Sequence, residues 1–257
     1  MFNLLLAELK REWIILRRYF TETIALIIGL VVAFYGIFQS ARFIAGPEIS
    51  LGDRADSLVI GYILWSMSIF ILGNIAGGLQ QEAQTGTLEQ LFISPFRASQ
   101  IFLIRAIGNL TIQLFLNALM LLIVMGITGA RLSFPPVLIL PLAAVLLGAY
   151  GLAMAMGSLA LLLKRVQQVL GIFQFLLFFV LMVPTETWSH SLRGLGWILP
   201  MTPGAELLRS VMARGETLQG GAVAIALLNG AAYFILGLLL FRIAEREAKR
   251  RGKLSGY

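Results

Sequence analysis

Six long apolar runs restrict this 257-residue chain to the folds that a membrane permits. The runs cover about residues 21–39, 58–80, 106–128, 136–163, 166–184 and 222–241. Each approaches or exceeds the roughly 20 residues that a helix needs to cross a hydrocarbon core about 30 Å thick. Inside lipid every backbone N–H and C=O must be bonded within the protein, and a single run can achieve this as a helix. The runs therefore predict an all-α membrane protein with six transmembrane helices, forming one domain over residues 1–257.

The composition supports this class and excludes others. Charged residues make up 13% of the chain and hydrophobic residues 58%, whereas soluble domains carry about 25% charged residues. The net charge is +7, but no basic cluster is interleaved with aromatic residues, so we expect no nucleic-acid partner. The chain has no cysteine and one histidine, which excludes disulfides and argues against a structural zinc site.

Basic residues are divided unequally between the two sides of the predicted bundle. The richer side holds fourteen of them: Lys10, Arg11, Arg17, Arg18, Arg97, Arg105, Lys164, Arg165, Arg242, Arg246, Lys249, Arg250, Arg251 and Lys253. The poorer side holds six: Arg42, Arg54, Arg131, Arg193, Arg209 and Arg214. Cytoplasmic loops carry the excess of Lys and Arg. Both termini and the loop 81–105 are therefore predicted to be cytoplasmic.

Two segments outside the apolar runs have their own patterns. Residues 1–19 alternate apolar and basic positions at helical spacing, which predicts a helix lying in the headgroup layer. Between the fifth and sixth runs, residues 185–221 contain a central stretch, 194–199, that is too short to span. We expect this segment to dip into the membrane from the outside without crossing it, with a half-helix over 204–212.

The loop 82–97 carries the signals of a short helix held outside the membrane. Thr87 and Gln90 fit a capping box, and Pro95 cannot continue a helix. Three apolar side chains share one face between these limits: Leu88, Leu91 and Phe92. Glu89 lies off that face. Such a helix can lie on lipid or dock into the groove of a partner, and its periodicity alone does not choose between the two.

The order of residues in this loop resembles the cytoplasmic loop of ABC-2 type permeases, the membrane subunits of ATP-driven exporters, and the drug-efflux branch in particular. The matching residues are Glu82, Gly86, Thr87, Leu88, Glu89, Gln90, Leu91, Ser94 and Pro95. In that family the loop is a coupling helix that fits a groove on a separate ATPase subunit. The resemblance implies that the ATPase-coupling residues are Glu82, Thr87, Leu88, Glu89, Leu91, Phe92, Pro95 and Arg97.

A second stretch resembles the same family. Pro200-Met201-Thr202-Pro203, followed by Leu207-Leu208-Arg209, is similar to the Asn-Pro-(apolar)-Thr and Leu-Arg elements that precede the last span of ABC-2 permeases. There they form a re-entrant helical hairpin that caps the pathway on the outer face. This chain departs from the pattern in having Leu199 where the family usually has Asn, and an additional Pro203.

Polar side chains recur every four residues in the third run: Arg105, Asn109, Gln113 and Asn117. They line the route of an amphipathic substrate, or they form interhelical hydrogen bonds worth about 0.6–2 kcal/mol each; we favour the second. In the fifth run Gln174, Phe178 and Met182 share one face. The resemblance implies that the second and fifth spans face the translocation cavity, which makes this face a candidate for substrate contact. In the second run Gly73 and Gly77 form a small-xxx-small pair that predicts close helix packing.

The sequence contains no nucleotide-binding Gly-x-x-x-x-Gly-Lys-Ser/Thr motif and no Asp, Glu, Lys, Arg or His in the middle of a run. The second absence argues against a proton-coupled carrier. The resemblance implies a permease subunit of an ABC exporter in a prokaryotic cell membrane, paired with a second permease subunit as a homodimer or a heterodimer. Catalytic, metal and cofactor sites are not expected in this chain, because the ATPase subunit binds ATP. The cargo stays open between a hydrophobic drug, a lipid and a glycan. The alternatives are a secondary transporter and a membrane scaffold.

Overall fold

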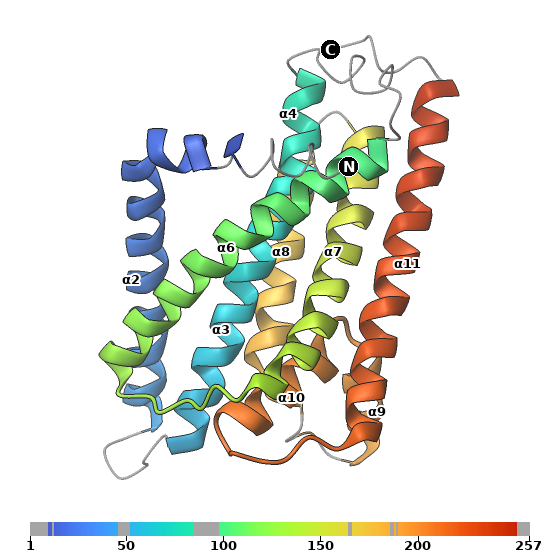
Figure 1. The fold of residues 1–257 in the computed structure, drawn as a ribbon. Helices are drawn as coiled ribbons and strands as arrows, with labels where there is room; N and C mark the ends of the chain where they lie inside the picture. The colour runs from blue at the N-terminus through green and yellow to red at the C-terminus, as the bar shows by residue number, and fades with distance from the viewer. Residues whose placement is uncertain are drawn as a thin grey trace.

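The computed structural model describes residues 10–11, 13–45, 52–84, 98–163, 166–185, 188 and 190–250. The regular elements in these residues are all helical, which confirms the all-α prediction (Figure 1). They are α2 (Phe20–Ala45), α3 (Gly52–Leu72), the π-helical turn η1 (Gly73–Gly77), α4 (Gly78–Gln84), α6 (Ala98–Thr128), the 3-10 turn η2 (Pro136–Leu138), α7 (Ile139–Leu162), α8 (Gln167–Met182), α9 (His190–Ile198), α10 (Thr202–Met212) and α11 (Gly220–Arg250).

Five helical stretches in the described part of the chain are long and apolar enough to cross a membrane. They cover Phe20–Ile44, Ala55–Gln81, Gly108–Thr128, Pro136–Leu162 and Gly220–Ala248. The fifth predicted run instead forms α8, which has 16 residues and is therefore about 24 Å long at 1.5 Å per residue. This is shorter than a hydrocarbon core of about 30 Å. Six full spans are therefore not confirmed in the described residues, because α8 is shorter than the run 166–184 from which a span was predicted.

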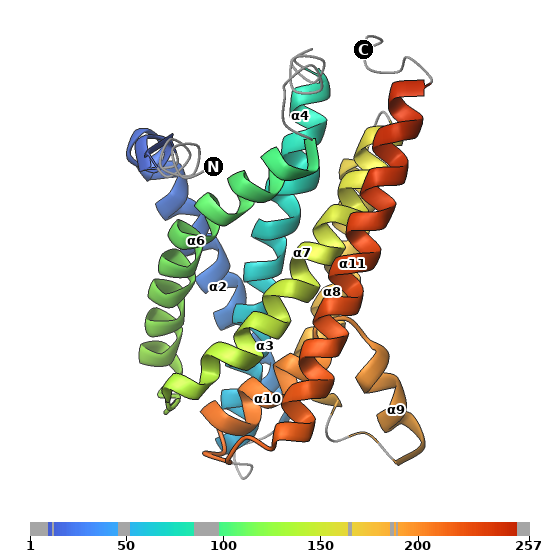
Figure 2. The ribbon, with the colours of Figure 1, turned by 45° about the vertical axis from the view of Figure 1, so that its right-hand side comes forward.

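The most extensive packing in the molecule joins α7 to α11, which run side by side in both ribbon views (Figures 1 and 2). Small residues let the two backbones meet. A Cβ atom on Gly237 would overlap the carbonyl group of Gly151, and one on Gly230 would overlap the carbonyl of Ala144. Because neither glycine carries that atom, the helices approach to backbone contact, as small residues allow in membranes.

Helix α3 lies at the centre of the bundle and contacts α2, α6, α7, α8 and α10. Tyr62 is fully buried, and its hydroxyl donates to the carbonyl oxygen of Leu30 in α2 at 2.7 Å. On another side of α3, the Trp65 indole N–H donates to the carbonyl oxygen of Gln174 in α8 at 2.9 Å. These bonds fix α3 between its neighbours.

The span that contains α3 is interrupted by η1. The backbone N–H of Gly78 reaches the carbonyl of Gly73, five residues earlier, which defines the wider π-helical turn. A Cβ atom on Gly73 or on Gly77 would meet nothing within 4 Å. The prediction that this pair packs closely against another helix is therefore wrong within the described chain. Gly73 and Gly77 are instead the first and last residues of the irregular turn.

The elements divide between two ends of the bundle (Figures 1 and 2). The start of α2, the end of α4, the start of α6 and the end of α11 lie at one end, which we call the inner end. The short helices α9 and α10 lie at the opposite, outer end with the connection from α6 to α7. With 9 and 11 residues, α9 and α10 are too short to cross a membrane.

Replacing Gly237 with alanine should destabilise the bundle by about 1–3 kcal/mol, because the added methyl group overlaps the backbone of α7. The matched control is Gly171→Ala in α8, whose Cβ would enter open space and which should be neutral or slightly stabilising. Thermal unfolding of the purified protein in detergent measures both. Equal melting temperatures for the two variants would contradict the backbone contact between α7 and α11.

Candidate functional site

Of the region that holds the predicted ATPase-coupling residues, the structure describes the two flanking helices, α4 and α6. Helix α4 ends at Gln84 and α6 begins at Ala98, both at the inner end of the bundle (Figure 1). Residues 85–97, with Thr87, Leu88, Glu89, Leu91, Phe92, Pro95 and Arg97, lie outside the described residues, as does the side chain of Glu82. Their role in coupling stays a prediction.

The polar stripe of the third run lies on α6 and meets α3. Gln113 and Asn117 are both buried, and Asn109 is partly exposed. The Ser66 hydroxyl of α3 donates to Asn117 Oδ1 at 2.9 Å, and Asn117 Nδ2 donates to the carbonyl oxygen of Gln113 at 2.9 Å. At Asn117, therefore, the stripe forms an interhelical hydrogen bond. Whether the stripe also contacts a substrate stays a prediction.

The candidate face of α8 contacts α3 at Trp65, the residue next to Ser66 in the sequence. Phe178 packs edge-on against the Trp65 ring, with 4.9 Å between ring centroids. The carbonyl of Gln174 accepts the indole N–H of Trp65, and Met182 is buried beyond them. The structure thus brings both candidate faces to adjacent positions on α3. The sequence analysis missed Trp65, although a tryptophan ten residues inside the span Ala55–Gln81 departs from the usual placement of tryptophan at membrane interfaces.

A second polar constellation lies at the outer end, where α9 turns into α10. The side chain of Asn229 in α11 binds this turn through both of its polar atoms. Asn229 Nδ2 donates to three carbonyl oxygens, those of Trp197 at 2.8 Å, Leu199 at 3.2 Å and Ile198 at 3.4 Å. Asn229 Oδ1 accepts the backbone N–H of Met201 at 3.3 Å. One turn above on α11, the Tyr233 hydroxyl donates to the carbonyl of Ile198 at 2.8 Å.

Met201 is the centre of that turn. Its φ angle of 67° lies in the left-handed region, which costs a residue other than glycine about 1–3 kcal/mol and persists where the surroundings enforce it. Met201 is 1% exposed, its Sδ atom is 3.7 Å from the Ser68 hydroxyl of α3, and its side chain packs on Gly148 of α7. Three spans therefore hold the turn in place.

Thr202 closes the turn from within. Its hydroxyl lies 2.6 Å from the carbonyl oxygen of Leu199 and 2.7 Å from that of Gly196. Both are carbonyls near the end of α9, where intrahelical donors are absent. The Pro-Met-Thr stretch that the sequence analysis singled out thus forms a compact turn whose polar groups are satisfied by side chains from α10 and α11.

Arg209 lies in α10, within the half-helix predicted over residues 204–212. Its side chain is fully buried. Its Nη2 atom donates to the carbonyl oxygen of Leu181, in the last turn of α8. That carbonyl has no partner within its own helix, and a cation is favoured at a helix C-terminus. Gly61 of α3 makes room for the guanidinium group, because a Cβ atom at this position would lie 3.3 Å from Arg209 Nη2.

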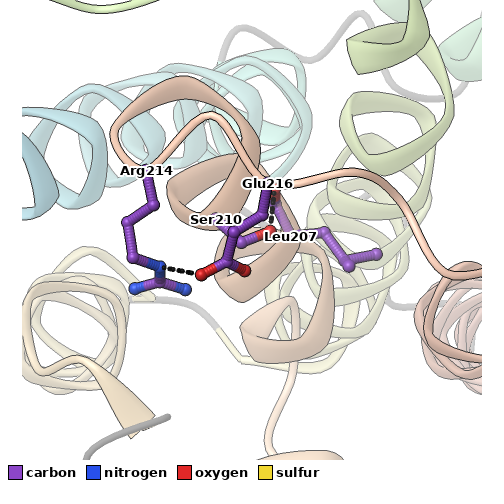
Figure 3. Close-up of polar contacts among 4 residues, drawn as sticks. All are labelled: Leu207, Ser210, Arg214 and Glu216. Carbon is purple, nitrogen blue, oxygen red and sulfur yellow. Dashed lines mark hydrogen bonds and ion pairs between the residues drawn. The ribbon is translucent and has the colours of Figure 1, made fainter.

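An ion pair between Arg214 and Glu216 follows α10. Unlike Arg209, which is fully buried, this pair is exposed to solvent. Arg214 Nε lies 2.9 Å from Glu216 Oε1, and the backbone N–H of Glu216 donates to the carbonyl of Ser210 at 3.0 Å (Figure 3). The Ser210 hydroxyl donates in turn to the carbonyl of Leu207 at 3.1 Å. An exposed pair of this kind contributes about 0–1 kcal/mol.

The two arginines provide a matched test. Arg209→Met should destabilise the protein by about 1–3 kcal/mol, because it leaves the Leu181 carbonyl buried without its donor. Arg214→Met should change stability by less than about 1 kcal/mol. Thermal unfolding in detergent compares them directly. The capping role of Arg209 would be refuted by a melting temperature as high as that of Arg214→Met.

Comparison with known proteins places the chain in a family. The sequence pattern of the family described as ABC-2 family transporter protein matches residues 50–241, most of the chain. The match begins before α3 and ends within α11, so it includes α3, the candidate faces of α6 and α8, and the outer turn. A comparison with curated protein sequences gave no match. By the extent of the family match, the chain belongs to the ABC-2 family of transporter proteins.

Proposed function

We propose that the chain is the membrane-spanning permease subunit of an ATP-driven ABC exporter. It forms the translocation path together with a second permease subunit and couples to a separate ATPase subunit. The observation that carries this proposal is the membership of the ABC-2 family, in which the membrane subunit is a transport component. The position of the 85–97 loop between α4 and α6 supports it.

The distribution of charge supports a cytoplasmic inner end. Lys10, Arg11, Arg242, Arg246 and Arg250 belong to the parts of the chain that begin and end the bundle there. Basic residues accumulate on the cytoplasmic side of membrane proteins. The loop 85–97 then faces the compartment that contains ATP, as coupling to an ATPase requires.

Helix α3 is the element that would transmit the motion. α3 continues through η1 and α4, which ends at Gln84 directly before residues 85–97, so we propose that a displacement of those residues reaches α3 through these two elements. Ser66 and Trp65 connect α3 to α6 and α8, and Ser68 contacts Met201 of the outer turn. Closure of the ATPase dimer on ATP would thus shift the two candidate substrate faces and the outer turn together.

The route that we propose for the cargo follows these two faces. It runs along Asn109, Gln113 and Asn117 of α6 and along Gln174, Phe178 and Met182 of α8. Amide groups beside aromatic and thioether groups suit an amphipathic cargo, because they bind its polar and apolar parts separately. The cargo class is a hydrophobic drug, a lipid or a glycan.

The coupling face is tested by Leu91→Asp. Central apolar anchors carry most of the energy of an interface, whereas charges at the rim tune the rate of association and its salt dependence. Leu91→Asp should preserve insertion and pairing of the permease but reduce recovery of the ATPase at least tenfold and abolish transport. The matched variant Glu89→Lys should have a milder, salt-sensitive effect.

Two measurements decide the matter: recovery of the ATPase subunit with the tagged permease, and ATP hydrolysis in membranes. If Leu91→Asp retains ATPase and stimulates hydrolysis at the level of the unmodified protein, the segment 82–97 is an ordinary loop. The coupling assignment would then be wrong.

A further inference from the structure

We propose that Asn229 is a latch: it holds α9 against the outer end of the bundle, and its release lets α9 swing away on a hinge at Met201. The inference rests on the proposed function, since opening of the outer end is a step of export. Asn229 acts as a positioning residue, through the turn that it holds.

Helix α9 is attached differently from α10. Ten of the eleven residues of α10 are buried, whereas Leu195, Trp197 and Ile198 of α9 are 52%, 51% and 69% exposed. Apolar burial therefore fixes α10 in the bundle but contributes little to holding the end of α9. The left-handed residue Met201 separates the fixed helix from the exposed one.

In the described part of the chain, three side chains hold the end of α9: Thr202 of α10, whose hydroxyl lies 2.7 Å from the Gly196 carbonyl oxygen, and Asn229 and Tyr233 of α11. The carbonyls of residues 197–199 converge on Asn229 Nδ2, and Tyr233 adds one bond to Ile198. A carboxamide has two N–H hydrogens, so three acceptors must share them. Shared, partly exposed bonds of this kind are exchanged readily for bonds to water. The seated position of α9 is therefore stable but easily released.

A group beneath α9 favours release. Thr185 is 2% exposed, and its hydroxyl has no hydrogen-bond partner among the described residues. It lies under α9, because a Cβ atom on Gly196 would be 3.2 Å from Thr185 Cβ and 3.5 Å from Thr185 Oγ1. A buried hydroxyl without a partner is unfavourable, and water would satisfy it when α9 lifts. The Asn229 and Tyr233 bonds oppose this gain.

The latch also connects the two ends of the molecule. The chain has Leu199 in the turn where the resembling family usually has Asn, and here Asn229 of α11 supplies an amide to the turn. Helix α11 is continuous from Gly220 to Arg250 and so runs from the latch to the inner end (Figure 2). A displacement of α11 at the inner end would move Asn229 relative to the turn and release α9.

The test uses Thr185→Cys as a reporter in a chain that has no other cysteine. The full chain is assembled with its ATPase subunit in membranes, and an impermeant thiol reagent is added from outside. Without nucleotide the reporter should react slowly. With a non-hydrolysable ATP analogue it should react about tenfold faster, the change expected when about one hydrogen bond of 1.4 kcal/mol is lost.

Asn229→Asp isolates the latch. The carboxylate keeps an acceptor for the Met201 N–H but has no N–H for the three carbonyls of α9. In this variant the reporter should react about tenfold faster without nucleotide and should gain little from the analogue. Tyr233→Phe removes the single bond to Ile198 and should give an intermediate rate. A second reporter, Ser158→Cys, buried in α7 away from α9, should stay unreactive in every variant.

Each outcome separates the latch from the proposed function. If the analogue accelerates labelling but Asn229→Asp without nucleotide stays as slow as the unmodified chain, the latch is wrong and the ATP-driven function stands. If Asn229→Asp accelerates labelling at Thr185→Cys alone and the analogue has no effect on any chain, the latch stands and the ATP-driven function is wrong. If Asn229→Asp also exposes Ser158→Cys, the residue merely stabilises the fold and the latch is refuted.

Discussion

The architecture depends on one constraint: a backbone polar group in lipid must find its hydrogen bond inside the protein. Five stretches satisfy it as long helices, whereas α8 and α9 have 16 and 9 residues. The carbonyls at these two helix ends have no intrahelical donors. Arg209 supplies the donor for Leu181, and Asn229 supplies donors for residues 197–199. The irregular outer end is therefore possible because α10 and α11 carry these two side chains.

The same polar contacts relate the outer end to the rest of the bundle. Helix α3 touches α6 through Ser66, α8 through Trp65 and the outer turn through Ser68. All three residues lie within one turn of α3, so a small displacement of this helix acts on both candidate substrate faces and on the turn. Beside it, α7 packs on α11 in backbone contact at Gly237.

The sequence predicts the long helices well, because a single run of apolar residues in lipid can satisfy its backbone hydrogen bonds by forming a helix. It predicts the outer end less well. The half-helix that contains Arg209 was predicted, but the burial of this side chain was not, because the carbonyl that it caps belongs to a residue 28 positions earlier. Asn229 is a single polar residue in an apolar run, and its partners become visible when α9 is folded against α11. The coupling residues from Thr87 to Arg97 were predicted from resemblance and periodicity, and they lie outside the described residues.

The central claim is that the chain between α8 and α11 returns without crossing, so that the loop 85–97 and the C-terminus share the side of the ATPase. Single-cysteine labelling of intact cells with an impermeant thiol reagent tests it most directly. The account predicts labelling of Ser40→Cys and Thr217→Cys, and no labelling of Ser94→Cys or Ser255→Cys until the cells are opened. Labelling of Ser255→Cys in intact cells would show that the segment crosses. Labelling of Ser94→Cys would place the loop away from ATP and contradict the account.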